Sequence, residues 1–580
     1  MSTSLKGTAA APGAAAAPAF IVEATAVPPE SLPATHAGSV DDEVGRLNEA
    51  LGRAEAELRE LAERVAASAG EDEAEIFEAH AEFAADPELA SQAKEAIKLG
   101  ESAERAVSQA FESFRVVLAS SQSEYLAARA ADLADVRDRV VAILLGKDTG
   151  VPVPAERSVI AAFELTPSQT ASIPRDLIAA VVTETGSPTS HAAILARSLG
   201  IPAVVACHEL LDHIEPGVVV AIDGRSGDVT VAPDEFERRA IEERRLREEE
   251  RRVELTALRD EPGRTGDGHR VELAANLGSP EDLPVAIEAG AEGSGLVRTE
   301  FLFIGRRAAP SVDDQVSYYS EVLRAFPGRR VVFRTMDIGA DKPLDFAAQP
   351  PEENPALGVR GIRLSLLESG LLETQLRALL RAASEVGDGA GRLAIMFPMI
   401  STAAEFVRAK EICVAVARGA DVDLDGIEIG AMIEVPAAAL SAARIAARAD
   451  FLSIGTNDLL QYLFAADRLN GRVSELADVC EPDVLSLIGG IIRAGHENSA
   501  WVGICGESAS DPIVAAALVG LGADELSMTR VAIPEVKDTL RRLTVEACRG
   551  AVAVAIKEAS DGSEARSILA ERLDLGAPST

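Results

Sequence analysis

The C-terminal half of the chain is a series of short apolar runs, each followed by a stretch whose apolar residues have helical spacing. The runs are VELAANL from Val271, GSGLVR from Gly293, VVFRTM from Val331, LAIMFPM from Leu393, IEIGAMIE from Ile427, FLSIGTN from Phe451, WVGIC from Trp501 and ELSM from Glu525. Eight such alternations over about 300 residues predict a (β/α)8 barrel, whose active site lies at the carboxyl ends of its strands. Polar residues fall at those ends, namely Arg298, Arg334, Glu434, Asn457, Asp458 and Cys505. A core packed only for stability needs no charges there, so we expect an active site at this end of the barrel.

Positive charge gathers at the predicted barrel mouth although the chain as a whole is strongly acidic. Lys and Arg number 56 against 93 Asp and Glu, for a net charge of -37. A surface this negative repels nucleic-acid phosphates and anionic lipid headgroups, so we expect no binding to nucleic acid or to a membrane. The mouth nevertheless carries Arg298, Arg334, Lys342 and Arg468. Each alone is most often a surface ion pair, but four together predict a pocket for a phosphorylated, carboxylated anion.

Two carboxylates and a cysteine complete this predicted site. Glu434 in MIEVP and Asp458 in GTNDL supply hard oxygen ligands from adjacent strands. Mg²⁺ takes one or two carboxylates together with substrate oxygens, so the pair suits magnesium held with a phosphate. Cys505 in GICGES is either a small buried hydrophobe, the commonest state of a free cysteine, or an acid that donates a proton to the substrate.

The N-terminal half predicts two further domains and a linker. Residues 1–34 and 146–232 have β/α texture and predict one discontinuous domain. Between them, residues 35–145 carry apolar residues at three- and four-residue intervals, which predicts an all-helical insertion. On periodicity alone this insertion is a plain helical bundle. Residues 233–262 are highly charged and predict an exposed linker helix, which leaves residues 263–575 for the barrel.

A second constellation lies in the segment TETGSPTSHAAILARSLGIPAVV. Thr189 and Ser190 precede His191, and a helix is predicted to follow. A capped helix start offers free N–H groups and the positive end of the helix dipole, so a phosphate carried by His191 would be stabilised there. The other histidines have no such setting, and we interpret them as structural or exposed.

The cysteines and the apolar segments favour a cytoplasmic protein. The five cysteines are widely spaced and include no CxxC pair, which fits a reducing compartment. No uninterrupted apolar run reaches the roughly 18 to 20 residues of a membrane span. The Ala-rich start is broken by Pro12, Gly13 and Pro18, unlike a signal peptide.

Taken together, these motifs closely resemble the enzyme I family of the bacterial phosphoenolpyruvate:sugar phosphotransferase system, the phosphoenolpyruvate-protein phosphotransferases. The resemblance spans nearly the whole chain. It rests on GTAAAPGAA, YLAARAADLADVRDRV, TSHAAILARSLGIPAVV, VRTEFLF, FRTMDIGADKPL, ENPALGVRGIRL, IGTNDLLQY and GICGESASDP. It implies that phosphoenolpyruvate phosphorylates the chain, which passes the phosphoryl group to the histidine phosphocarrier protein and releases pyruvate.

The resemblance also implies a role for individual residues. His191 is the phosphorylated histidine, Thr189 belongs to its catalytic motif, and Cys505 is the proton donor. Phosphoenolpyruvate is bound by Arg298, Arg334, Lys342, Asn457, Asp458 and Arg468. Glu434 and Asp458 hold Mg²⁺. The helical insertion docks the phosphocarrier protein, for which we favour the segment from Glu75 to Leu89, and the barrel forms a homodimer.

One departure from the family pattern and three alternatives remain. Where the family commonly has GGRTSH, this chain has GSPTSH, from Gly186 to His191.

A pyruvate phosphate dikinase or phosphoenolpyruvate synthase shares both sites but adds an ATP-binding domain, for which residues 1–157 show no Gly-rich loop. A non-catalytic phosphoenolpyruvate sensor would not require Cys505. A nitrogen-regulatory paralogue would normally carry an additional N-terminal sensory domain.

Overall fold

In the computed structural model the chain forms two compact units, Met1–Arg251 and Arg252–Thr580. The structure describes residues 2–22, 31–36, 38–68, 71–119, 124–147, 153–188, 190, 193, 196–197, 200–304, 306, 308–339, 346, 352–387, 389–468, 470 and 472–576.

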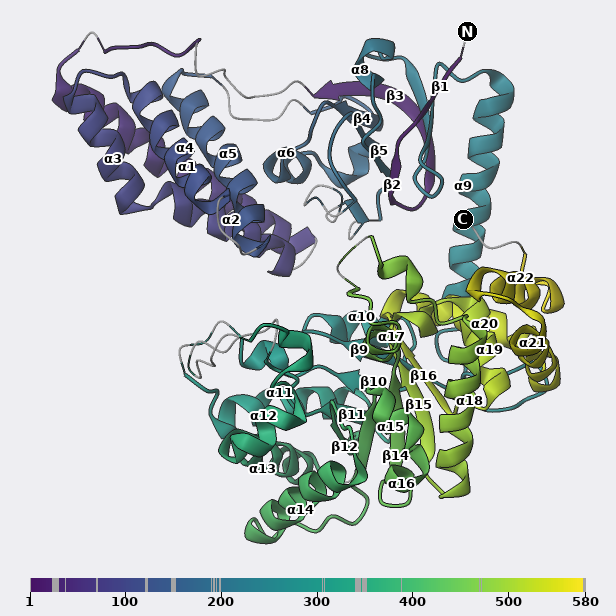
Figure 1. Cartoon of the computed structure of the whole chain (residues 1–580). Coiled ribbons are helices and arrows are strands. Elements are labelled where there is room, and N and C mark those ends of the chain that lie inside the picture. Colours follow the sequence, from purple (N-terminus) through teal and green to yellow (C-terminus); the bar gives the residue numbers. More distant parts are fainter. Residues whose placement is uncertain are drawn as a thin grey trace. The chain divides into compact units, whose positions relative to one another are not determined.

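The first unit contains a group of antiparallel helices (Figure 1). They are α1 (Val40–Ser68), α2 (Glu71–Ala84), α3 (Pro87–Lys98), α4 (Ala103–Ala119) and α5 (Glu124–Leu144). Apolar residues at helical spacing form their common core, which includes Leu47, Leu58, Val107, Phe111 and Val140. The Asp86 side chain caps the start of α3 by accepting the N–H groups of Glu88 and Leu89.

The rest of the first unit is built on one eight-stranded sheet with the order β1-β8-β7-β3-β4-β5-β6-β2. The strands are β1 (Thr3–Lys6), β2 (Thr8–Ala11), β3 (Ala14–Val22), β4 (Ser158–Ala162), β5 (Ile178–Thr183), β6 (Ala203–Val205), β7 (Val219–Asp223) and β8 (Asp228–Val231). Short helices connect them, namely α6 (Pro167–Ser172), η2 (Arg175–Leu177) and α8 (Leu210–His213). Because β3 pairs with β4 and β7, strands from before and after the helical group share one sheet.

Helix α9 (Glu235–Thr256) contains the boundary between the two units. None of its side chains is buried, and charged residues occupy most of its positions. Arg244 pairs with Asp223 at the end of β7, which ties the first half of the helix to the sheet.

The second unit is a closed barrel of eight parallel strands surrounded by helices (Figure 1). Its strands are β9 (Glu272–Leu277), β10 (Ser294–Val297), β11 (Arg330–Arg334), β12 (Arg392–Phe397), β13 (Glu428–Ile433), β14 (Phe451–Gly455), β15 (Trp501–Cys505) and β16 (Glu525–Met528). The helices are α10 (Asp282–Glu288), η3 (Glu300–Leu302), α11 (Val312–Ala325), η4 (Pro355–Leu357), α12 (Ile362–Leu367), α13 (Ser369–Val386), α14 (Ala403–Gly419), α15 (Pro436–Leu440), α16 (Ala442–Ala446), α17 (Thr456–Phe464), η5 (Ser474–Leu476), α18 (Pro482–Glu497), η6 (Glu507–Ser510), α19 (Pro512–Leu521), η7 (Arg530–Ala532), α20 (Ile533–Arg541), α21 (Val545–Glu558) and α22 (Gly562–Arg572).

Side chains fill the inside of the barrel from its amino end almost to its mouth. Leu296, Val332, Ala394, Met396, Met432, Phe451 and Cys505 form a buried apolar cluster of their own. At the amino ends of the strands, which we call the barrel floor, Trp501 stacks on Phe451 with ring centroids 4.5 Å apart. The Arg330 guanidinium lies 3.8 Å from the centroid of the Trp501 ring on β15. Arg330 also pairs with Glu272 at 3.0 Å and with Glu428 at 2.9 Å, so an ion-pair cluster closes the floor.

The predicted fold class is confirmed. Each of the eight apolar runs contains one barrel strand, and the β/α domain with its all-helical insertion is present. None of the helices in the described part of the chain is long and apolar enough to cross a bilayer.

Candidate active site

A cavity of about 90 Å³ opens at the carboxyl ends of the barrel strands. It is lined by Leu296, Arg298, Glu300, Arg334, Asp337, Arg360, Met432, Glu434, Gly455, Asn457, Asp458, Arg468, Cys505 and Gly506. Four of these residues are arginines and four are carboxylates, so the formal charges of the lining cancel.

The strand ends supply most of the residues that the sequence predicted for this site. Arg334 and Cys505 are the last residues of β11 and β15. Arg298 and Glu434 follow directly after β10 and β13. Asn457 and Asp458 lie in the first turn of α17, which begins where β14 ends, and Arg468 comes from the loop after that helix. All seven line the same cavity.

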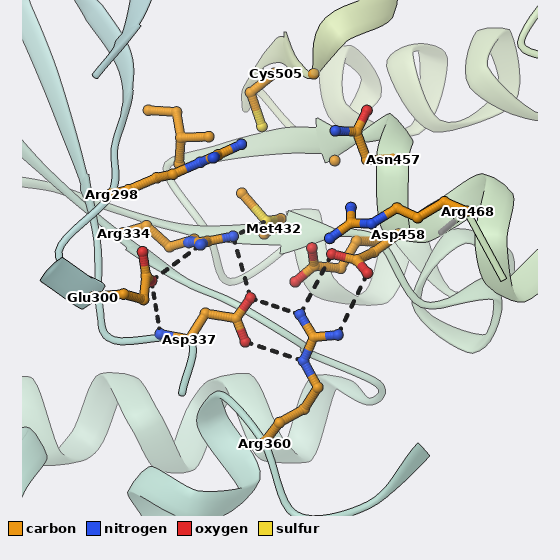
Figure 2. A pocket seen from close by; sticks show the side chains of 14 residues that line it. Arg298, Glu300, Arg334, Asp337, Arg360, Met432, Asn457, Asp458, Arg468 and Cys505 are labelled. Atoms are coloured by element: carbon orange, nitrogen blue, oxygen red, sulfur yellow. Dashed lines mark hydrogen bonds and ion pairs between the residues drawn. The ribbon is translucent and has the colours of Figure 1, made fainter. Parts of the chain in front are cut away.

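An unbroken chain of alternating charges crosses the cavity (Figure 2). Glu300 Oε1 lies 3.0 Å from Arg334 Nη2, and Arg334 Nη1 lies 3.2 Å from Asp337 Oδ2. Asp337 Oδ2 also accepts from Arg360 Nη2 at 2.8 Å, and Arg360 Nη1 reaches Asp458 Oδ1 at 3.4 Å. All five side chains are buried, so each charge depends on its neighbours for compensation.

Three members of this charge chain, Glu300, Asp337 and Arg360, were not predicted. Each lies within a motif that carries the family resemblance, namely VRTEFLF, FRTMDIGADKPL or ENPALGVRGIRL. Gly361 carried a usable signal, because its φ of +56° is a conformation that favours glycine. A Cβ there would lie 2.9 Å from Asp337 Oδ1, so the glycine lets the Arg360 backbone approach the site closely.

Three of the arginines keep donors for a ligand. Arg298 and Arg468 are exposed at the rim, and neither forms an ion pair with another described residue. The buried Arg334 Nε–H has no hydrogen-bond partner among the described residues. A planar guanidinium with a free donor suits the oxygens of a carboxylate or phosphate group.

Cys505 lies on the cavity wall as a buried thiol. Burial raises the pKa of its thiol to about 11, although the hydrogen bond from Ser453 acts in the opposite direction. Ser453 Oγ donates to Cys505 Sγ at 3.2 Å, and the thiol faces the Ile454 carbonyl at 3.7 Å. At neutral pH the side chain therefore carries its proton, as a proton donor must.

Glu434 and Asp458 fit the chemistry of a magnesium site. Glu434 is 1% exposed and its Oε1 accepts the Met399 N–H at 2.6 Å. Burial, together with Asp337 and Asp458, raises the pKa of Glu434 to about 8, so a cation beside it would relieve this repulsion. No group of three or more His, Cys, Asp or Glu in the described ranges has metal-binding geometry. A metal ion here would thus complete its coordination with water and substrate oxygens, as Mg²⁺ commonly does.

Three family models of phosphoenolpyruvate-utilising enzymes match the chain. The N-terminal domain model matches residues 6–129, the mobile domain model residues 154–227 and the PEP-binding domain model residues 252–545.

Curated relatives match over almost their full length. A phosphoenolpyruvate-protein phosphotransferase of Priestia megaterium is 42% identical over 551 residues, which cover 94% of this chain and 95% of the relative. One of Streptomyces coelicolor is 45% identical and covers 93% of both chains. The chain belongs to the phosphoenolpyruvate-protein phosphotransferase family. Among solved structures, an NMR solution structure of Enzyme I (nEIt) is 34% identical and covers 42% of this chain and 99% of that chain, with a TM-score of 0.37.

Membership of the phosphoenolpyruvate-protein phosphotransferase family confirms the predicted resemblance and makes the chain a phosphoenolpyruvate-dependent phosphotransferase. The PEP-binding domain model covers all eight barrel strands and every residue of the charge chain. The four lining arginines therefore all lie within the matched PEP-binding domain.

Three predicted residues, Thr189, His191 and Lys342, lie outside the described residues. Next to His191, the Ser190 hydroxyl accepts the Ala193 N–H at 3.4 Å, which is the contact of a helix-capping serine. Arg197 donates from Nε to the Ala10 carbonyl at 3.1 Å, which ties this segment to β2 of the sheet.

Proposed function

We propose that the chain transfers the phosphoryl group of phosphoenolpyruvate to its own His191 and then to the histidine phosphocarrier protein. This is the first step of sugar uptake by the phosphotransferase system, and it releases pyruvate. The observation that carries the proposal is the meeting of four arginines, two metal-competent carboxylates and a protonated thiol in one barrel-mouth cavity.

The arginines and the polar residues bind and orient the substrate. Arg298, Arg334 and Arg468, with Asn457, Asp458 and Lys342, hold the phosphate and carboxylate of phosphoenolpyruvate. Arg360 lines the same cavity and joins this set. Glu434 and Asp458 hold Mg²⁺, which neutralises phosphate charge when bound. Fixed positive charge around the transferring group is the main source of catalysis in phosphoryl transfer.

The reaction uses His191 as nucleophile and Cys505 as acid. Unprotonated His191 Nε2 attacks phosphorus in line, the bond to the bridging oxygen breaks, and the enolate of pyruvate leaves. The Cys505 thiol gives its proton to the methylene carbon, which forms pyruvate, and the thiolate takes a proton from water. Thr189 acts beside His191 in the phosphohistidine motif.

Each domain has its own role in this reaction. Residues 1–34 and 146–232 carry the phosphohistidine, residues 35–145 dock the phosphocarrier protein, and residues 263–575 bind phosphoenolpyruvate and form the homodimer. The linker in residues 233–262 is where the phosphohistidine domain moves relative to the barrel. Exposed Glu78, Glu82 and Glu88 on α2 and α3 give the docking segment an acidic surface suited to a basic partner.

The test is to mix the purified protein with ³²P-labelled phosphoenolpyruvate and Mg²⁺ without ATP. We expect an acid-labile, base-stable label that moves to an added phosphocarrier protein and that fails to form when EDTA removes Mg²⁺. His191→Ala should abolish the label, whereas His208→Ala, at an exposed position of the same unit, should leave it unchanged. Binding of phosphoenolpyruvate without label would favour a sensor, and labelling only with ATP would favour a dikinase.

A further inference from the structure

Glu300 and Asp337 are the members of the charge chain that neither the sequence nor the proposed reaction explains, and Glu300 lies at the end of this charge chain. Glu300 is the first residue of η3, three residues after the end of β10, and is 5% exposed. Its carboxylate is therefore held in a low-dielectric environment, where a charge is costly unless it makes strong contacts.

One oxygen of Glu300 makes two such contacts. Oε1 accepts from Arg334 Nη2 at 3.0 Å and from the Asp337 backbone N–H at 2.9 Å. The same atom therefore fixes the Arg334 guanidinium relative to the turn that follows β11. Because Arg334 Nη1 also pairs with Asp337 at 3.2 Å, the plane of the guanidinium is held at two points.

The position of Glu300 is itself fixed by a buried polar network. The neighbouring Thr299 donates from Oγ1 to the Arg334 carbonyl at 2.9 Å. Gln375 on α13 donates to Thr299 Oγ1 at 3.0 Å and accepts the Met336 N–H at 2.9 Å. The ends of β10 and β11 are thus joined by side-chain hydrogen bonds on both sides of Arg334.

The electrostatic effect of this arrangement agrees with its geometry. Burial disfavours the charged form of Arg334, but Glu300 and Asp337 outweigh it and raise the pKa of Arg334 above its ordinary value. Arg334 stays charged in a buried place, and its unpartnered Nε–H is left for a ligand.

We propose that Glu300 is a positioning residue, which orients Arg334 and, through Asp337, sets the separation of Arg334 from Arg360 for binding the phosphoenolpyruvate anion. This inference rests on the proposed function, because it takes phosphoenolpyruvate as the ligand of this cavity. A carboxylate that only stabilised the barrel would not affect ligand affinity through Arg334.

The test measures the Kd of phosphoenolpyruvate with Mg²⁺ by calorimetry in a His191→Ala background, where no phosphoryl transfer takes place. We expect Glu300→Ala to weaken binding on the order of 10- to 100-fold, the usual effect of losing a hydrogen bond to a charged group. The isosteric Glu300→Gln keeps an acceptor oxygen and should fold in the same way, so its loss should be smaller, about 3- to 10-fold. Glu385→Gln, which removes an exposed partner of Arg381, is the matched control and should bind as the parent does.

A double-mutant cycle separates positioning from a general structural role. In an Arg334→Ala background, Glu300→Ala should cause almost no further loss of affinity, because the group that it positions is gone. Equal Kd values for the parent and both Glu300 variants, or losses that multiply in the double variant, would overturn the inference and leave the proposed function intact. No binding of phosphoenolpyruvate by the parent, with no label in the wild type, would instead refute the proposed function.

Discussion

The hydroxyl of Ser453 is the described polar side chain that contacts the Cys505 thiol. Ser453 lies on β14, one strand away from Cys505 on β15, and both side chains are buried. A buried thiol that must face a carbon atom needs a group to orient it, and this hydroxyl is placed to do so.

We therefore predict that Ser453→Ala slows the formation of pyruvate about tenfold, within the range of effects on general acid catalysis. The pKa of the Cys505 thiol should rise, because the Ser453 hydrogen bond lowers it. The KM for phosphoenolpyruvate should stay within about twofold, since Ser453 does not line the cavity. Steady-state kinetics measure kcat and KM, and Ser453→Thr is the control that keeps the hydroxyl. An unchanged kcat in Ser453→Ala would show that the thiol needs no such partner.

Single residues of the site differ in how far the sequence predicted them. Arg298, Arg334, Glu434, Asp458 and Cys505 stand at the ends of apolar runs, and the barrel topology assigns those ends to the active site. Glu300, Asp337 and Arg360 share no spacing with each other, and pairs of buried charges form only when the strands are assembled. Only the glycine that follows Arg360 gave a local signal, and nothing in the sequence distinguished Glu300 and Asp337 from ordinary surface charges.

At the scale of elements, one lysine of α20 joins three chain segments of the barrel unit. Lys537 is 0% exposed, and its Nζ donates to the carbonyls of Leu258, Arg259 and Gly290 at 3.2, 3.0 and 3.1 Å. Two of these carbonyls follow the end of α9, and the third lies in the turn between α10 and β10. The ammonium group thus donates to carbonyls that follow the ends of two helices and would otherwise be buried acceptors without a partner.

We predict that Lys537→Met lowers the free energy of unfolding of the barrel unit by about 2–4 kcal/mol, because it leaves buried carbonyls without a donor. Thermal unfolding measured by circular dichroism tests this. Lys557→Met, at an exposed position of α21, is the control and should change stability by less than about 0.5 kcal/mol. Equal melting curves for Lys537→Met and the wild type would mean that water replaces the ammonium without cost.

The elements themselves were predictable where one periodicity dominates. The helical insertion and the charged α9 follow from helical spacing, and each barrel strand lies within one of the predicted apolar runs. The strand order of the first sheet was not predictable, because β1, β2 and β3 pair with strands that lie more than a hundred residues away in the sequence.

At the scale of the whole molecule, stability depends on a carboxyl group in the barrel floor. Glu525 is 1% exposed, and neither of its oxygens has a hydrogen-bond partner among the described residues. Burial beside Glu272, Glu428 and Asp524 raises the pKa of Glu525 to about 8, against the effect of Arg330 at 3.8 Å. A glutamate in an unfolded chain titrates near pH ~4.3.

The folded chain therefore keeps a proton between about pH 4 and pH 8 that the unfolded chain loses, so this group makes the free energy of unfolding fall as pH rises through that window. We predict that Glu525→Gln removes this contribution, and that wild type loses stability relative to the variant by up to about 1.4 kcal/mol per pH unit. Thermal unfolding at several pH values, followed by the fluorescence of the single tryptophan, Trp501, reports on the barrel floor directly.

The control for this experiment is Glu558→Gln, an exposed position of α21. Its stability should run parallel to that of the wild type at every pH. If the Glu525→Gln curve also runs parallel, the floor carboxyl titrates as an ordinary glutamate and the interpretation of the cluster is wrong.

The filled interior of the barrel determines how substrate and product can reach and leave the cavity. The barrel is closed at its floor and open at its mouth. The apolar cluster that includes Cys505 fills its interior, and the stack of Phe451, Trp501 and Arg330 closes its floor. Substrate and product must therefore pass through the same opening at the barrel mouth, so a product molecule still in the cavity blocks the next substrate. In each turnover, product release must therefore precede binding of the next substrate molecule.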